Sequence, residues 1–117
     1  MQLDGIHHVS INVSDVPAAQ DFYVNVLGLD LLDRPDFGFP GAWLRSGQQE
    51  VHLIGIDSGP PLKEQHFAFK VENLDEVRAK LEEAGHKCSK PSEIPGVCLQ
   101  SFTHDPSGNM IEFNQRL

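Results

Sequence analysis

The chain contains one strand pattern twice, and this duplication constrains the fold more than any other feature of the sequence. HVSINVSD begins at His8 and HFAFKVEN begins at His66, and in both segments apolar residues occupy every second position after the histidine. Such alternation is typical of a strand with one buried face, so each histidine lies on the opposite, polar face. A helix-capping residue follows each strand, Asp15 or Asn73, and a glycine closes each helical run. The sequence therefore predicts two copies of one unit.

Each unit ends in a hairpin whose second strand carries another metal-ligating side chain. His52 follows His8 by 44 residues, and Glu112 follows His66 by 46 residues. Turn-forming residues precede both strands, SGQQ in the first unit and DPSGN in the second. Both His52 and Glu112 stand between apolar neighbours. Four metal-ligating residues thus fall at matching places in the two units.

A strong linker signal, DSGPP, lies near the middle of the chain. We predict a single domain over residues 1–117. Its first unit spans about residues 1–56, a linker spans 57–64, and the second unit spans about 65–117. The first unit is expected to contain strands over 5–13, 29–33, 42–45 and 50–55, with a helix after Asp15. The second is expected to contain strand 65–71, helix 74–84, strand 86–90, loop 91–96 and strands 97–103 and 109–115.

Composition narrows the class of protein. With 117 residues and 39% hydrophobic content, the chain is expected to form a single compact domain. A net charge of −8 argues against a nucleic-acid partner. No stretch approaches the roughly 18 consecutive apolar residues of a membrane span, and the N-terminus does not resemble a secretory signal. We therefore expect a cytoplasmic protein in which Cys88 and Cys98 stay reduced.

Three imidazoles and one carboxylate, from His8, His52, His66 and Glu112, form a donor set that suits Zn, Ni, Fe, Co or Mn better than Mg or Ca. An isolated histidine is more often structural than ligating, so the prediction of a divalent metal site depends on the four matching positions. Two arrangements stay open: four ligands with an expanded coordination sphere, or three ligands with one open position. His52 is the candidate ligand with the least support. Glu112 in a predicted sheet needs a polar cavity on its face.

Aromatic residues suggest where a substrate binds. The two prolines and two glycines of the segment RPDFGFPG predict an irregular loop. The loop carries Phe37 and Phe39, and a loop of this kind commonly folds over a ligand. In the following strand, AWLR, alternation places Trp43 and Arg45 on one face, where they are candidates to line a pocket. Phe102 in the second unit is a further candidate for an aromatic cleft.

The runs IHHVSINVSDVPAAQDFYVNVLGL, HFAFKVENLDEVRAKLEEAG and DPSGNMIEF resemble the vicinal oxygen chelate superfamily, which includes glyoxalase I, fosfomycin-resistance transferases, bleomycin-binding proteins and extradiol dioxygenases. The resemblance covers nearly the whole chain. It implies an α+β fold of two βαβββ modules in tandem, each a partial barrel wall. It also implies a homodimer with sites at its interface, in which ligands matching His8, His52, His66 and Glu112 hold a metal ion and a small-molecule substrate binds.

The activity that the resemblance implies is chelation of two adjacent substrate oxygens, with the metal stabilising an oxyanion or enediolate in a lyase, isomerase or transferase reaction. Glu112 matches the carboxylate that acts as catalytic base in glyoxalase I, whereas His52 stands where that enzyme has its other glutamate. An isomerisation that needs two bases is therefore compromised, and a one-base reaction remains open. The candidate substrate-binding residue Asn12 stands where glyoxalase I has an arginine that helps to hold glutathione.

Two alternatives remain open at this point. The first is a metal-free small-molecule binding protein of the bleomycin-resistance type, which the aromatic residues Phe37, Phe39, Trp43 and Phe102 favour. The second is an iron-dependent dioxygenase of the extradiol type, in which His52 or His104 would fill the role of an additional acid-base histidine.

Overall fold

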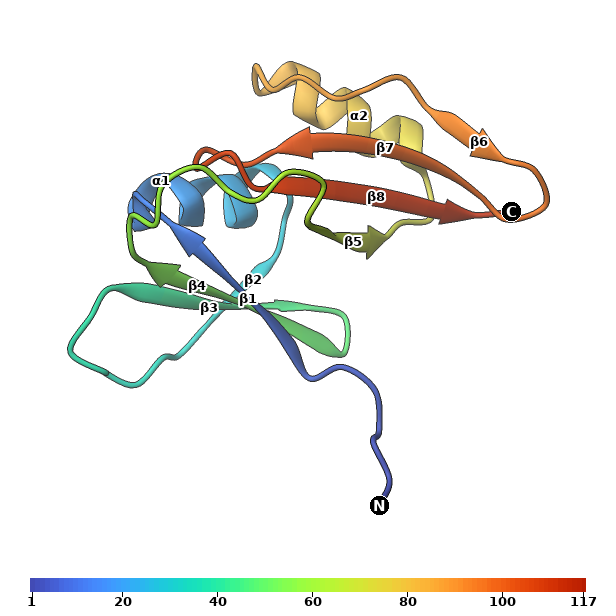
Figure 1. Ribbon diagram of the computed structural model, residues 1–117. Coiled ribbons are helices and arrows are strands. Elements are labelled where there is room, and N and C mark those ends of the chain that lie inside the picture. Colours follow the sequence, from blue (N-terminus) through green and yellow to red (C-terminus); the bar gives the residue numbers. More distant parts are fainter. The chain divides into compact units, whose positions relative to one another are not determined.

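The computed structural model describes residues 1–117 and divides into two compact units, Met1–Gly59 and Pro60–Leu117. The first unit contains β1 (His8–Val13), α1 (Val16–Asp21), the π-helical segment η1 (Phe22–Val26), β2 (Asp30–Leu32), β3 (Gly41–Ser46) and β4 (Gln49–Gly55) (Figure 1). The second contains β5 (His66–Lys70), α2 (Leu74–Glu83), β6 (Ser92–Ile94), β7 (Cys98–His104) and β8 (Met110–Arg116). The predicted α+β class with a βαβββ order in both units is confirmed.

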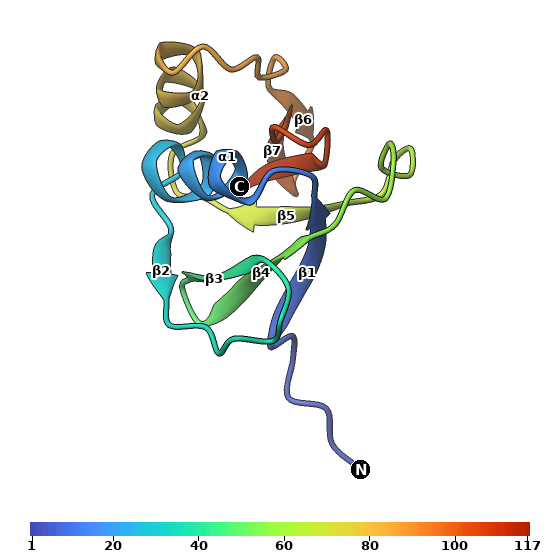
Figure 2. The same ribbon diagram turned by 90° about the vertical axis from the view of Figure 1, so that its left-hand side faces the viewer.

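Each unit has one open four-stranded sheet, and the two sheets share one topology. The strand orders are β1-β4-β3-β2 and β5-β8-β7-β6, and Figure 2 shows the four strands of the first unit side by side. In each unit the first and last strands pair in parallel, and the other neighbours pair antiparallel. The helical connection carries the chain to the far edge of the sheet, and the remaining strands return to the first one.

The core of the first unit forms where α1 covers one face of the sheet (Figure 1). Asp15 caps α1 by accepting a hydrogen bond from the Ala18 N–H at 3.0 Å. The helix then widens, and the Leu27 N–H donates to the Phe22 carbonyl five residues back, at 3.0 Å. Phe22 and Tyr23 are adjacent in sequence and are both almost fully buried. The π-helical turn accompanies this double burial, which stabilises the unit by about 1.5–3 kcal/mol for each large apolar side chain.

The second unit has a regular helix in the same place. Asn73 caps α2 by accepting a hydrogen bond from the Glu76 N–H at 3.1 Å, and α2 packs on β7 and β8. Leu74 and Leu81 are the buried residues of this helix, and Gly85 ends it with a positive φ of 83°. Since even α2 has only ten residues, neither helix could span a bilayer.

The strand predicted over 86–90 is wrong. Residues 86–91 are irregular, and the edge strand β6 lies at Ser92–Ile94, inside the predicted loop 91–96. The irregular segment is held to β7 by isolated hydrogen bonds, because the Ser89 N–H donates to the Phe102 carbonyl at 2.9 Å and Thr103 Oγ1 donates to the Lys87 carbonyl at 2.6 Å. Pro91 has no N–H to donate, so the backbone hydrogen bonds of β6 cannot continue through it into residues 86–90.

Candidate functional site

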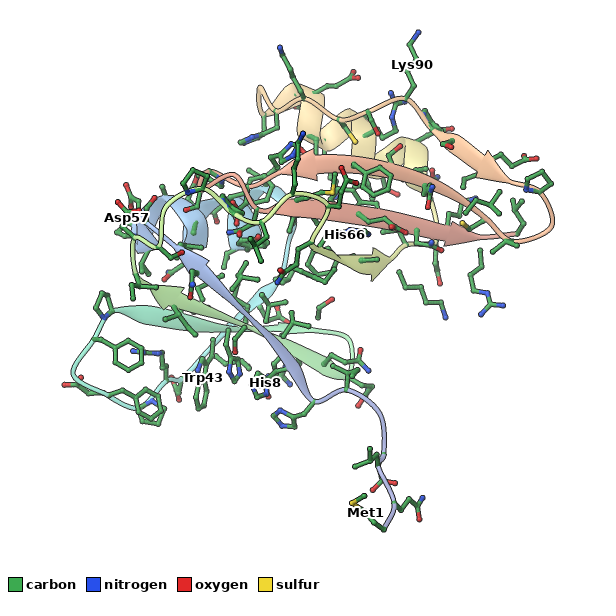
Figure 3. All side chains as sticks on the ribbon, viewed as in Figure 1. Met1, His8, Trp43, Asp57, His66 and Lys90 are labelled. Carbon is green, nitrogen blue, oxygen red and sulfur yellow. The ribbon has the colours of Figure 1, made fainter.

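In the first unit, three rings from three neighbouring strands stack on the face opposite α1. His8 on β1 and His52 on β4 have ring centroids 4.0 Å apart, and His52 and Trp43 on β3 have centroids 4.5 Å apart. The planes are tilted by only 15° and 11°. Figure 3 shows His8 and Trp43 projecting from the same side of this sheet, away from α1. The predicted alternation is confirmed here, and it brings two candidate ligands together.

Glu50, which does not belong to the four repeated ligand positions, adds a carboxylate to this group. Glu50 Oε1 lies 2.9 Å from His52 Nε2, and the two side chains are 28% and 12% exposed. The hydrogen bond from His52 lowers the pKa of Glu50, so the carboxyl group is ionised near neutral pH. An Nε2–H that donates to this carboxylate leaves the lone pair of His52 at Nδ1. The signal in the sequence was the strand alternation, which puts Glu50 on the same face as His52.

His8 has its own neighbour. Its Nδ1 lies 2.9 Å from Nδ1 of His7, so one of these nitrogens carries a proton and the other accepts it. His8 is therefore left with Nε2 as its second ring nitrogen for a further partner. One nitrogen of each ring, in His8 and in His52, is held by a polar neighbour.

In the second unit, His66 and Glu112 come together from strands that are 46 residues apart in the sequence. His66 Nε2 lies 3.1 Å from Glu112 Oε1, and the Glu112 side chain is only 11% exposed. The Glu64 carbonyl accepts a hydrogen bond from His66 Nδ1 at 2.8 Å, and Asn114 Nδ2 donates to Glu112 Oε2 at 2.9 Å. The bond to the Glu64 carbonyl is the main cause of a raised His66 pKa, to which Glu112 adds. Both side chains are thus held in place by second partners.

The donor atoms of the His66–Glu112 pair are spaced as two ligands of one divalent ion would be. Two ligand atoms about 2.1 Å from an ion and at right angles to each other lie about 3.0 Å apart, close to the 3.1 Å between His66 Nε2 and Glu112 Oε1. A ligating histidine commonly donates its other N–H to a carbonyl or carboxylate, as His66 does to Glu64. The structure groups the candidate ligands only in pairs, without three that could enclose an ion. The four-residue site stays a prediction.

The predicted substrate-binding residues are divided between the two sheets. Trp43 stacks on His52, and the Phe102 ring meets His66 edge-on, with centroids 5.6 Å apart. Asn12 lies on the polar face of β1, where its Nδ2 donates to Ser58 Oγ at 3.3 Å. Arg45 is exposed on β3, in register with Glu50 on β4. Of these four residues, Trp43 and Phe102 contact candidate ligands directly.

The loop before β3 extends the row of rings. Phe37 lies 5.9 Å from Trp43 and 6.0 Å from Phe39, centroid to centroid. Both phenylalanines are about half exposed, at 51% and 47%. We call the rings of Phe37, Phe39, Trp43, His52 and His8 the aromatic surface. It belongs entirely to the first unit, and the second unit has no row of comparable length on its candidate ligands.

Sequence comparison places this geometry in a family. The sequence model of one protein family, the Glyoxalase/Bleomycin resistance protein/Dioxygenase superfamily, matches residues 5–113 of this chain. The chain belongs to this superfamily. The match spans both units and all four candidate ligands, so the resemblance seen in the repeated motifs is confirmed.

Individual relatives agree with this assignment. Glyoxylase I 4 of Arabidopsis thaliana is 33% identical over 96% of this chain and 71% of its own length. A glyoxalase family protein from Bacillus anthracis has a TM-score of 0.90 at 26% identity, covering 100% of this chain and 98% of that one. TnmS3, an antibiotic binding protein from Streptomyces sp. CB03234, has a TM-score of 0.84 at 28% identity, covering 100% and 99%. The superfamily thus includes similar proteins named for catalysis and for binding.

Proposed function

We propose that this chain is a metal-dependent enzyme of the glyoxalase type that acts on a small substrate with two adjacent oxygens. The observation that carries the proposal is the His66–Glu112 pair, in which a nitrogen and an oxygen lie 3.1 Å apart and both side chains have second partners. A carboxylate that is 11% exposed needs a cation or hydrogen-bond donors to offset its desolvation. In the metal-free protein Asn114 and a protonated His66 supply donors, and an ion bound at His66 Nε2 would take the place of that proton and supply the charge.

His8, His52, His66 and Glu112 would hold the ion, which could be Zn, Ni, Mn, Co or Fe. The bound ion would polarise the substrate oxygens and stabilise negative charge on them. Glu112 is the carboxylate of this set, so we assign it the role of proton acceptor from the substrate. Asn114 orients Glu112 by holding Oε2. Trp43 and Phe102 would line the apolar part of the site, and Asn12 and Arg45 would contact polar groups of the substrate.

We further propose that the protein is a homodimer in which the first unit of one copy and the second unit of the other share each ion. Mixing the His8→Ala and His66→Ala variants tests this. In a mixed dimer one site combines a wild-type first unit with a wild-type second unit, so metal binding should return at one site per dimer. If mixing and exchange restore no binding, shared sites are contradicted.

Metal analysis tests the proposed function itself. Protein purified without chelators should contain a divalent ion or should unfold at a higher temperature when Zn, Ni, Mn, Co or Fe is added. His66→Ala should lower metal occupancy with little change in fold, whereas His86→Ala, a histidine beyond α2, should leave occupancy unchanged. Absence of both bound metal and a thermal shift in the wild type would overturn the proposal. Wild-type metal content in His66→Ala would refute the ligand assignment.

The aromatic surface favours a second candidate function, metal-free binding of an aromatic small molecule. Its rings are exposed at Phe37 and Phe39, and TnmS3, a similar protein, is named as antibiotic binding. Trp43 is the single tryptophan of the chain, so its fluorescence reports on ligands at this surface. Tight binding of an aromatic compound by protein treated with chelator, together with no binding of any divalent metal by the wild type, would favour this candidate over the enzyme.

A further inference from the structure

We propose that Arg34 binds a carboxylate of the substrate, and that the substrate is therefore an apolar or aromatic carboxylic acid whose body lies along the aromatic surface. The inference rests on the proposed function in one respect, since it takes this face of the first unit as the substrate-binding face. It adds an anion subsite, contributed by a loop residue.

The fold holds the Arg34 guanidinium in a defined place. Its Cζ lies 5.0 Å from the ring centroids of both Phe37 and Phe39, so cation–π attraction fixes it against two rings. Gly41 makes room for it at the start of β3. A Cβ at position 41 would lie 2.9 Å from Arg34 Nη2 and 2.5 Å from the Leu53 carbonyl oxygen. The half-buried arginine is thus packed into the base of its loop.

This cation has no anionic partner within the chain, although acidic residues outnumber basic ones by 17 to 9. The ion pairs of the chain are His52–Glu50, His66–Glu112 and Lys80–Glu76. Asp36, in the same loop, accepts a hydrogen bond from the Gly38 N–H at 2.8 Å. A positive group that is fixed but unpaired in an acidic chain is suited to an external anion.

The chemistry of the group favours a carboxylate. The guanidinium is planar and carries its N–H donors in that plane. Nη2 lies beside Gly41, so a ligand would meet the donors on the edge that points away from Gly41. Two parallel N–H donors match the two oxygens of a carboxylate, and such bidentate, charge-assisted pairs are the stronger hydrogen bonds. A phosphate group can also accept both donors of the fork, so phenyl phosphate is included among the probes.

The position of Arg34 also defines the rest of the ligand. From Arg34 the rings continue through Phe37 to Trp43, 5.9 Å on, and from Trp43 to His52, 4.5 Å on. A substrate whose carboxylate meets Arg34 would lay an apolar body on Phe37 and Trp43. Its opposite end would then lie at His52, a candidate metal ligand. The reacting oxygens and the recognised carboxylate are therefore separate groups of one molecule.

Trp43 fluorescence in chelator-treated protein tests the inference without any metal or turnover. The probes are benzoate, its neutral analogue benzamide, and phenyl phosphate. We expect benzoate to quench Trp43 emission with an affinity about tenfold or more above that of benzamide, because the carboxylate adds a charge-assisted bidentate pair. Arg34→Gln should remove this preference. Arg34→Lys should recover part of it, since lysine keeps the charge but loses the planar fork.

Arg116→Gln is the matched control, because it removes one positive charge from an exposed residue of the other unit. It should leave the benzoate preference unchanged, and thermal unfolding of each variant shows that the loss in Arg34→Gln is not a loss of fold. A response to benzoate that equals the response to benzamide, a preference for phenyl phosphate, or no response to any probe would overturn the inference. The proposed function fails separately, by absence of metal binding, and that result would leave the benzoate measurement intact.

Discussion

The two units share a topology, but they place their carboxylates differently. In the second unit the carboxylate is Glu112, which stands on the last strand and meets His66 directly at 3.1 Å. In the first unit the matching position is His52, and the carboxylate stands two residues earlier, at Glu50, where it meets His52 at 2.9 Å. The two units therefore share the position of the polar face of the sheet but carry different side chains on it.

The difference suggests a division of labour between the units. The second unit combines a nearly buried carboxylate with a single ring neighbour, Phe102. The first unit combines stacked imidazoles with the aromatic surface and Arg34. We interpret the second unit as the source of the anionic ligand and base, and the first unit as the source of substrate recognition.

The largest expected effect is a loss of metal affinity when the proposed ligands of the two units are substituted. Glu112→Gln removes the only anionic donor of the proposed set and should weaken binding of Zn or Ni by about 100-fold or more, beyond the 10- to 100-fold typical of outer-shell changes. His52→Gln removes a neutral donor and should weaken binding less than Glu112→Gln does, because the ion loses no compensating negative charge. Calorimetric titration measures both. Equal losses in the two variants would contradict the proposed division.

A second effect concerns the fold of the first unit. In Gly41→Ala the new Cβ would lie 2.5 Å from the Leu53 carbonyl oxygen and 2.9 Å from Arg34 Nη2. Strand β3 must shift, which should lower the free energy of unfolding by about 1–3 kcal/mol. At the matching place in the second unit stands Gln100, which already carries a side chain, so Gln100→Ala should change stability little. Urea denaturation of both variants checks this. An unchanged midpoint for Gly41→Ala would contradict the prediction, because β3 would then accommodate the new Cβ at no cost in stability.

A third effect sharpens the role of Glu50. Glu50→Gln keeps the shape of the side chain but loses the carboxylate that accepts from His52 Nε2. We expect metal affinity to fall by about tenfold, because ligating histidines depend on such partners for their orientation. Nitrogen chemical shifts of His52 should show that Nε2 no longer carries the proton exclusively. Glu93→Gln, at an exposed edge strand, is the control, and a tautomer that is unchanged in Glu50→Gln would contradict the assigned role.

The smallest effect is a pH dependence in the metal-free protein. The His66 pKa is raised above 6.5, first by the bond to the Glu64 carbonyl and then by Glu112. A raised pKa contributes stability that is complete below the unfolded value and is lost as pH rises through the folded value. The stability difference between wild type and His66→Gln should therefore shrink from pH about 5.5 to about 8.5, by less than about 1 kcal/mol because the side chain is partly exposed. A difference that grows with pH would contradict the assignment.

Much of the fold could be predicted because apolar alternation and capping residues are local signals. The faces of β1, β3 and β5 follow from alternation, and Asp15 and Asn73 cap the helices as expected. The π-helical segment could not be predicted, because it accompanies the burial of both Phe22 and Tyr23, and helical periodicity does not indicate that two adjacent residues are both buried. The strand over 86–90 failed for a similar reason, since side-chain hydrogen bonds to β7 replace a ladder there.

The candidate site was predictable in its pairs of residues and less so in its partners. Alternation placed His52 beside Trp43, and the repeat placed His66 with Glu112. Glu50 was visible by the same alternation but was not part of the repeat. Arg34 lies in an irregular loop, where no periodicity indicates the direction of a side chain. Its packing against two rings and its lack of an anionic partner in the chain are evident only from the folded structure.

A crystal structure of the protein soaked with Ni or Zn, with anomalous data collected at the metal edge, tests the central claim most directly. We predict one anomalous peak per chain, bonded to His66 Nε2 and Glu112 Oε1 and to imidazoles of a first unit, at about 2.0–2.2 Å. A peak bonded to neither His66 nor Glu112, or no peak in crystals shown to have taken up the metal solution, would contradict the account.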